Sequence, residues 1–98
     1  MAKTLVVTRH AGAVEWLQNY GFAECEVVTH FTPEMIKTGD VVVGILPLNL
    51  VAEVNLKGGR FFALDLVVPA ELRGTEMTAE MMTRLGAKIQ EYRVQAIS

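Results

Sequence analysis

Arg9 and His10 are the neighbouring residues of this sequence whose side chains are best suited to chemistry. Arginine presents a planar fork of donors that matches a phosphate or carboxylate, and histidine exchanges a proton near neutral pH. The pair follows the apolar residues 4–8 and precedes a segment with helical periodicity, so it should lie at a helix start that attracts anions. We interpret Arg9 and His10 as the edge of an anion-binding crevice, with Thr8 before them and Gly12 keeping the nearby backbone accessible. A capping histidine and a solvated arginine are the alternative.

Two further polar segments could reach the same crevice. Leu48 and Asn49 follow the most apolar part of the chain, residues 41–46. Asn49 could either cap a helix or hold a hydroxyl or phosphate of a ligand. Arg73 and Gly74 lie in a polar loop, and Arg73 could either cover the crevice or pair with a neighbouring glutamate. Both alternatives stay open for each segment.

Three other reactive side chains have simpler interpretations. His30, at the end of a predicted strand, is interpreted as a hydrogen-bonded edge residue, and Asp65 alone makes neither a metal site nor an acid–base pair. Cys25 is the single cysteine, which excludes an internal disulfide and suits a reducing compartment. Because the sequence has no cluster of cysteine and histidine, we expect no zinc site, and we expect no cofactor.

Alternating strand-like and helix-like segments must position the candidate residues. Short apolar runs rich in β-branched residues predict strands at residues 4–8, 26–29, 41–46 and 60–68. Apolar residues at helical spacing predict helices at residues 10–20 and 49–57, and a final helix that Thr78 caps. The apolar stripe expected for this final helix is Met81, Leu85, Ile89 and Tyr92.

This order of segments predicts one α/β domain over residues 1–98, a three-layer sandwich with helices on both faces of a sheet. We expect a mostly parallel, four-stranded sheet, and right-handed crossovers favour the strand order 2-1-3-4. In such sheets, ligands bind outside the carboxyl ends of the strands, where the direction of winding reverses. Residues 8–10 and 47–49 are the ends in question, so two distant polar clusters should meet in one crevice.

The composition limits the classes of partner. Nine basic and eleven acidic residues give a formal net charge of −2, which argues against binding long nucleic acid but permits a small phosphorylated ligand. Hydrophobic residues make up 51% of the 98 positions, a surplus that favours a homodimer, although a parallel sheet covered on both faces is an alternative. No stretch resembles a signal peptide or a membrane span, so we expect the cytoplasm and no membrane contact.

Three segments together resemble a known family. Residues 7–16 read Val-Thr-Arg-His-Ala-Gly-Ala-Val-Glu-Trp, residues 44–54 contain Gly-Ile-Leu-Pro-Leu-Asn-Leu, and residues 71–80 contain Glu-Leu-Arg-Gly-Thr-Glu-Met-Thr. In this order and spacing they resemble the small CRISPR-associated proteins of type III systems named Csx-sixteen. The resemblance covers nearly the whole chain, and it is specific only because all three segments occur together.

The resemblance implies a standalone ring nuclease, which binds cyclic oligoadenylate, chiefly cyclic tetra-adenylate, and cuts it to linear products. That cleavage removes the second messenger that activates antiviral effectors. It also implies a Rossmann-like (CARF-like) domain that dimerises and holds the ring across a two-fold axis. By this resemblance Arg9 would hold phosphate oxygens, His10 would act as acid, base or hydrogen-bond donor, Asn49 and the backbone near Gly12 would position ribose or phosphate, and Arg73 would cover the ring.

Two alternatives differ in their chemistry. A non-catalytic sensor or sponge would bind cyclic oligoadenylate in the same crevice and would need phosphate donors without in-line alignment. The Arg9-His10 pair also resembles the Arg-His-Gly signature of histidine phosphatases, in which the histidine is phosphorylated. Here Ala11 follows the pair, the chain is about half the length of those enzymes, and His30 would have to serve as the second catalytic histidine.

Overall fold

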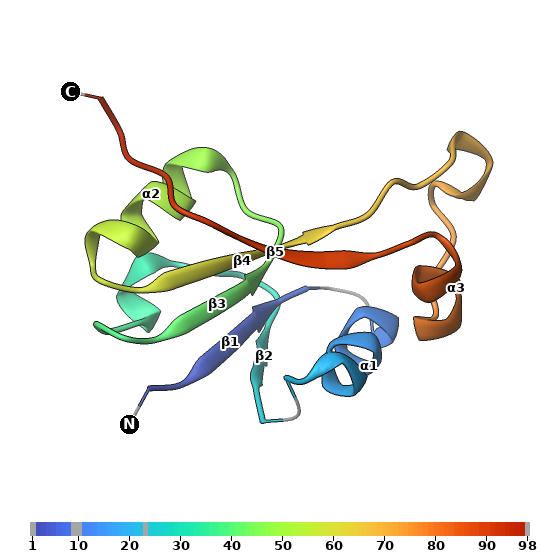
Figure 1. Ribbon diagram of the computed structural model, residues 1–98, viewed down its shortest axis with the longest axis horizontal. Helices are drawn as coiled ribbons and strands as arrows, with labels where there is room; N and C mark the ends of the chain where they lie inside the picture. The colour runs from blue at the N-terminus through green and yellow to red at the C-terminus, as the bar shows by residue number, and fades with distance from the viewer. Residues whose placement is uncertain (1, 9–10, 23, 98) are drawn as a thin grey trace.

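A computed structural model describes residues 2–8, 11–22 and 24–97, so Arg9 and His10 lie outside the described residues (Figure 1). The elements in these ranges follow one another as β1 (Thr4–Val7), α1 (Ala11–Tyr20), β2 (Glu26–Val28), η1 (Pro33–Met35), β3 (Val41–Gly44), α2 (Leu48–Leu56), β4 (Arg60–Asp65), η2 (Ala70–Leu72), α3 (Ala79–Arg84) and β5 (Lys88–Tyr92). The two η elements are single turns of 3₁₀ helix. Among the described helices, none has the length and apolarity needed to cross a membrane.

One mixed sheet organises the domain, with the strand order β2-β1-β3-β4-β5. The first four strands are parallel and adopt the predicted order 2-1-3-4. Leu5 of β1 pairs with Glu26 on one side and Val42 on the other, and Val42 pairs in turn with Phe61 of β4. The winding therefore reverses between β1 and β3, as the alternation of segments predicted.

The prediction of four strands and a long final helix was wrong. Helix α3 ends at Arg84, and Gly86 then adopts a φ of +77°, which reverses the chain direction. The following residues form β5, which pairs antiparallel with β4 and places Ile89 opposite Leu64. This pairing satisfies the backbone groups along the outer side of β4, which a helix in the same place would leave unpaired. The helical spacing of the apolar residues was therefore overruled by a partner strand distant in sequence.

Helices cover both faces of the sheet, as predicted. Helices α1 and α3 lie against one face, where the buried cluster consists of Val6, Ala13, Trp16, Leu17, Val43, Leu64, Met77 and Met82. Helix α2 and the η1 turn lie against the other face, where the buried cluster consists of Leu5, Phe31, Ile36, Val42, Val51, Val54 and Phe61. Alternate residues of β1 and β3 serve the two clusters, which is the period of a strand buried on both sides.

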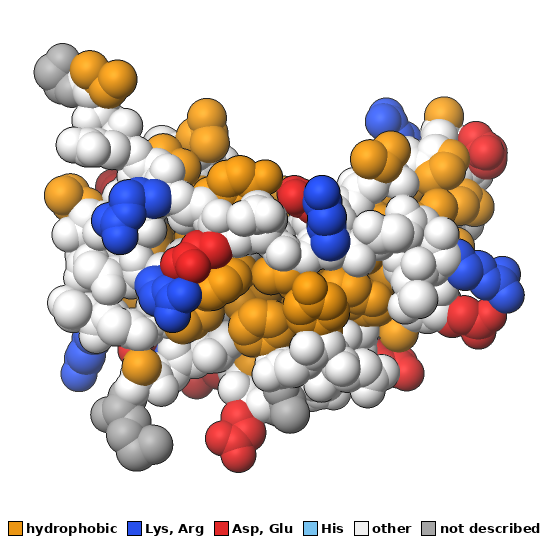
Figure 2. Space-filling view, in the orientation of Figure 1, with side chains coloured by type: hydrophobic (Ala, Val, Ile, Leu, Met, Phe, Trp, Pro, Cys, Tyr) orange, Lys and Arg blue, Asp and Glu red, His pale blue; other side chains and the backbone are white. Residues whose placement is uncertain are grey.

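An aromatic row runs over the first face from α1 to β4. Trp16 stacks on Tyr20 with ring centroids 4.9 Å apart, and Tyr20 lies 6.5 Å from Phe22. Phe22 meets the edge of Phe62, whose ring lies beneath the guanidinium group of Arg60 at 5.1 Å. Figure 2 shows apolar side chains gathered in the middle of this side of the molecule, beside oppositely charged groups.

Candidate functional site

A crevice lies at the carboxyl ends of the parallel strands, where the reversal of winding placed it. Its volume is about 370 Å³. The residues that line it are Val7, Thr8, Ala13, Thr29, Gly44, Ile45, Leu64, Leu66, Val68, Met77 and Met82. They come from the ends of four strands and from the helices on the first face. Thr8, which the sequence analysis placed at this edge, is among them, and its backbone N–H donates to the carbonyl of Val28 at 3.1 Å.

The walls of this crevice are mostly apolar. Among the described residues that line it, Thr8 and Thr29 alone have polar side chains, and none has a charged one. Such a surface favours the flat, weakly hydrated face of a base or another ring. Charged groups that could hold phosphate must therefore come from its rim.

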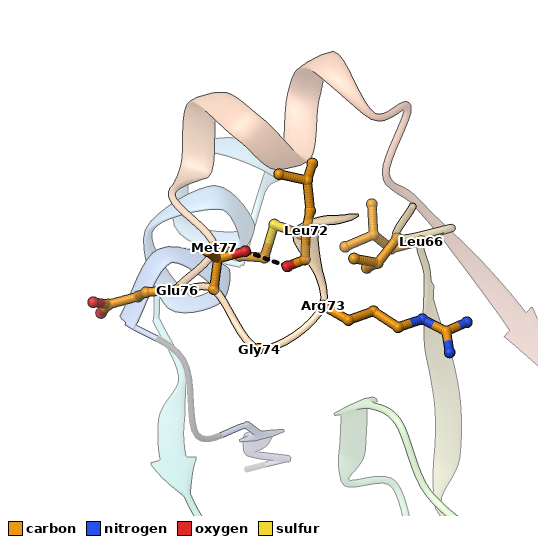
Figure 3. A pocket seen from close by; sticks show the side chains of 8 residues that line it. Leu66, Leu72, Arg73, Gly74, Glu76 and Met77 are labelled. Atoms are coloured by element: carbon orange, nitrogen blue, oxygen red, sulfur yellow. Dashed lines mark hydrogen bonds between the residues drawn. The ribbon is translucent and has the colours of Figure 1, made fainter. Parts of the chain in front are cut away.

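A second hollow of about 800 Å³ adjoins the crevice and carries the loop of Arg73 and Gly74. Leu66, Val68 and Met77 line both spaces, so the two are neighbours in the fold. Figure 3 shows the Arg73 side chain extending past Leu66, while the carboxylate of Glu76 points away on the opposite side. The expectation that this loop approaches the crevice is consistent with this arrangement.

The Arg73 loop is a compact turn. The backbone N–H of Leu72 donates to the carbonyl of Pro69 at 2.9 Å, and that of Arg73 donates to Ala70 at 3.3 Å. Thr75 donates to the carbonyl of Leu72 twice, once from its N–H at 3.2 Å and once from its hydroxyl. The side chains of the loop are thus carried by one hydrogen-bonded unit.

Gly12 lies in the first turn of α1 and packs directly on the chain that enters α3. A methyl group on Gly12 would lie 1.8 Å from the carbonyl oxygen of Met77 and 2.9 Å from the Cα of Thr78. The expectation that Gly12 leaves the backbone accessible is therefore wrong for this side of the residue. Protein backbone, and not a ligand, occupies the space that the absent side chain leaves.

Helix α3 has its own cap, and a side-chain hydrogen bond joins it to α1. The hydroxyl of Thr78 accepts the N–H of Met81 at 3.1 Å, which confirms the predicted cap. The indole Nε1 of Trp16 donates to the hydroxyl of Thr83 at 3.2 Å, and this hydroxyl donates to the carbonyl of Ala79 at 3.1 Å. The segment that follows the Arg73 loop therefore leads into α3, which is packed against α1.

Asn49 lies elsewhere in the fold. Helix α2 begins at Leu48 with Pro47 as its N-cap, so the alternative in which Asn49 caps this helix is wrong. Asn49 belongs instead to a groove of about 630 Å³ between α2 and the C-terminal segment. Neither Leu48 nor Asn49 is among the residues that line the crevice, and Gly44 and Ile45 reach it from the end of β3. The expectation that residues 8–10 and 47–49 meet in one crevice is therefore wrong for the described residues, because Thr8 lines the crevice and residues 47–49 do not.

The remaining reactive groups offer no second chemical centre in the described ranges. Burial raises the pKa of the Cys25 thiol, which keeps this side chain protonated. His30 is exposed beyond the end of β2. No group of three His, Cys, Asp or Glu side chains able to hold a metal ion occurs among the residues described.

Several residues that line the crevice were not predicted as site residues from the sequence. Thr29 and Ile45 follow strands, and Leu66 and Val68 follow β4, which ends at Asp65 instead of continuing to residue 68. Their position just beyond a strand was the available signal. Nothing in the local sequence marks Met77 as a wall of both hollows.

Comparison with known proteins agrees with the CRISPR association suggested by the resemblance. No curated protein and no solved structure gives a significant match to the chain. One family model does match, over residues 5–95, and its description is "Putative CRISPR-associated protein (Cas_VVA1548)". This match spans nearly the whole domain, from Leu5 of β1 past the end of β5, and includes the loop of Arg73. The chain therefore belongs to this CRISPR-associated family.

Proposed function

We propose that this protein is a ring nuclease of the cytoplasm that binds cyclic oligoadenylate, chiefly cyclic tetra-adenylate, and cleaves it to linear products. The observation that carries the proposal is the crevice at the strand ends. Thr8 lines it immediately before Arg9 in the sequence, and the adjoining hollow carries Arg73. The resemblance to the Csx-sixteen proteins suggests the substrate class, and membership of a CRISPR-associated family supports it.

The polarity of the two hollows suggests how a ring would be held. An adenine base suits the apolar crevice, in which Thr8 and Thr29 supply the polar part of the lining. The linking phosphates suit the rim, where Arg73 and Arg9 would supply bidentate donors. The four parallel strands with helices on both faces support the Rossmann-like, CARF-like relationship that we propose for the domain.

Cleavage in this proposal needs no metal. The 2′-hydroxyl of one ribose attacks the adjacent phosphorus in line, forming the O2′–P bond of a 2′,3′-cyclic phosphate while the P–O5′ bond breaks. The proton leaves O2′, and the departing O5′ receives one. Arg9 stabilises the negative charge on the phosphate oxygens, and His10 handles a proton or donates a hydrogen bond.

A homodimer would surround the ring with two such rims. Ile45, beyond β3, and Leu48, at the start of α2, are each 73% exposed, and Val67, beyond β4, is 83% exposed. These apolar side chains belong to the segments that follow the carboxyl ends of the strands. Burial of such residues between two copies would supply the hydrophobic driving force for association.

Chromatography of cyclic tetra-adenylate incubated with the protein and a chelator tests the function. Linear products formed with chelator present support the metal-independent ring nuclease. A ring that binds but stays intact would support the non-catalytic sensor or sponge. Absence of both binding and cleavage for rings of three to six adenylates would exclude both functions. Hydrolysis of a phosphate monoester, assayed in parallel, would instead support the phosphatase alternative.

A further inference from the structure

We propose that Gly12 is a positioning residue that sets the place of the Arg73 loop over the crevice. The proposal rests on the proposed function, because it assigns Arg73 to ligand binding. Gly12 acts through Met77, because the absence of a side chain on Gly12 lets the backbone of Met77 pack against α1. Its role is therefore to hold another part of the site, and not to touch the ligand.

The contact between Gly12 and Met77 tolerates no side chain. The carbonyl oxygen and carbon of Met77 would lie 1.8 and 2.8 Å from a methyl group on Gly12, whereas real Cβ atoms essentially never come closer than 3.0 Å to such atoms. The opposing atoms belong to the backbone, so no side-chain rotation relieves the clash. The helix α1 and the segment at Met77 would have to separate by about 1.2 Å, the difference between 3.0 and 1.8 Å.

A displacement of Met77 would move Arg73 as well, because the short segment between them has little conformational freedom. Residues 69–75 are tied together by the hydrogen bonds of the turn, and Glu76 alone separates that turn from Met77. Met77 is itself buried, with 8% of its surface exposed, and forms a wall of both hollows. Moving it changes the shape of the crevice and the place from which the Arg73 side chain extends.

The fold has enough other contacts to survive such a displacement. The bond from Trp16 to Thr83 and the buried cluster shared by Leu17 and Met82 also hold α3 against α1. Alanine also forms helix more readily than glycine, so the helical position itself favours the substitution. Gly12→Ala should therefore give a folded protein whose site is displaced.

Ligand binding by Gly12→Ala, Arg73→Ala and the double variant tests the coupling. We expect each single change to raise the KM for cyclic tetra-adenylate about tenfold with kcat held within about twofold, and the double variant to match Arg73→Ala alone. Losses that multiply in the double variant would show that Gly12 acts independently of the loop and would overturn the proposal. So would an unchanged KM in Gly12→Ala.

A measurement made without ligand tests the positioning role of Gly12 separately from the proposed ring nuclease activity. Trp16 is the single tryptophan and is bonded to α3, so its fluorescence reports the docking of α3 on α1. We expect a shifted Trp16 emission in Gly12→Ala. Val54→Ala, in the core on the other face, is the matched control and should leave Trp16 emission and KM unchanged despite its loss of stability.

The outcomes distinguish the two levels of inference. Wild-type turnover with an unshifted Trp16 signal and normal KM in Gly12→Ala would overturn the positioning role alone. A wild-type protein that neither binds nor cleaves any ring would overturn the proposed function and the positioning role with it. Should Gly12→Ala fail to fold, Thr78→Ala loosens the same connection more mildly. As a single variant, Thr78→Ala should raise the KM. Added to Arg73→Ala it should cause no further rise, and a further rise in the double variant would contradict the proposal.

Discussion

The carboxylate of Asp40 accepts the backbone N–H of Lys3 at 3.0 Å and so joins the start of the chain to the loop before β3. The other carboxylate oxygen accepts the N–H of Lys37 at 2.9 Å. Asp40 is buried, with 4% of its surface exposed. These two hydrogen bonds and the charges of the two lysines hold the pKa of Asp40 below its ordinary value, although burial opposes them.

This arrangement predicts a loss of stability in acid. Because the folded pKa of Asp40 is lowered, its contribution is complete above the unfolded value of 3.8 and is lost as the pH falls through the folded pKa. Asp40→Asn should lower the free energy of unfolding by about 1–3 kcal/mol at pH 7, since one oxygen no longer accepts an N–H. Urea denaturation at several pH values measures both effects. A difference between wild type and variant that does not shrink as the pH falls below 3.8 would contradict this account.

Arg9→Ala and His10→Ala should each abolish cleavage of cyclic tetra-adenylate while leaving the circular dichroism spectrum intact. Loss of a phosphate donor or a proton-transfer group costs at least about a hundredfold in rate. Arg84→Ala is a matched control, because Arg84 forms an exposed ion pair with Glu80 on α3. Unchanged turnover in both test variants would remove the site from the end of β1.

Asn49→Ala should change turnover less than Arg9→Ala does. Asn49 lines the groove beside the C-terminal segment and not the crevice, so we expect kcat/KM to fall by less than about threefold. Single-turnover assays of both variants make the comparison. A loss as large as that of Arg9→Ala would place Asn49 at the ring, as the family resemblance implied.

Leu48→Glu, and Ile45→Glu separately, should convert a homodimer to monomers and weaken ring cleavage. A charge at the centre of an apolar interface is buried without a partner, which strongly opposes association. Analytical ultracentrifugation measures the mass. Leu56→Glu is the control, because Leu56 is 88% exposed at the far end of α2. A wild-type protein that is monomeric at assay concentrations would contradict the dimer.

Gly86→Ala should destabilise the domain by about 1 kcal/mol through its backbone conformation alone. Gly86 has a φ of +77°, and nothing lies within 4 Å of the added methyl group. Gly86→Asn is the matched control and should cost less, because asparagine tolerates the left-handed region. Thermal denaturation of the two variants gives the order, and equal stability of wild type and Gly86→Ala would refute this role of the turn.

Much of the domain could be read from local pattern. The apolar runs at residues 41–46 and 60–68 predicted parallel strands, and the alternation with helices predicted their order and the reversal beside β1. Thr78 was identified as a cap from its own neighbours, as the bond from Met81 confirms. These features depend on the chain within a few residues, or on the general handedness of crossovers, which is why the sequence sufficed.

Only the tertiary structure decided which of the distant segments meet. Ile89 has helical spacing with Leu85 in the sequence, yet it pairs with Leu64 because the outer side of β4 offers unpaired backbone. The sequence around Gly12 does not predict its contact with Met77. The two residues are 65 positions apart, and the contact involves backbone atoms alone. The sequence by itself determined the strands and the end of the sheet at which a crevice forms. Long-range packing determined its walls, because these depend on contacts that no local pattern records.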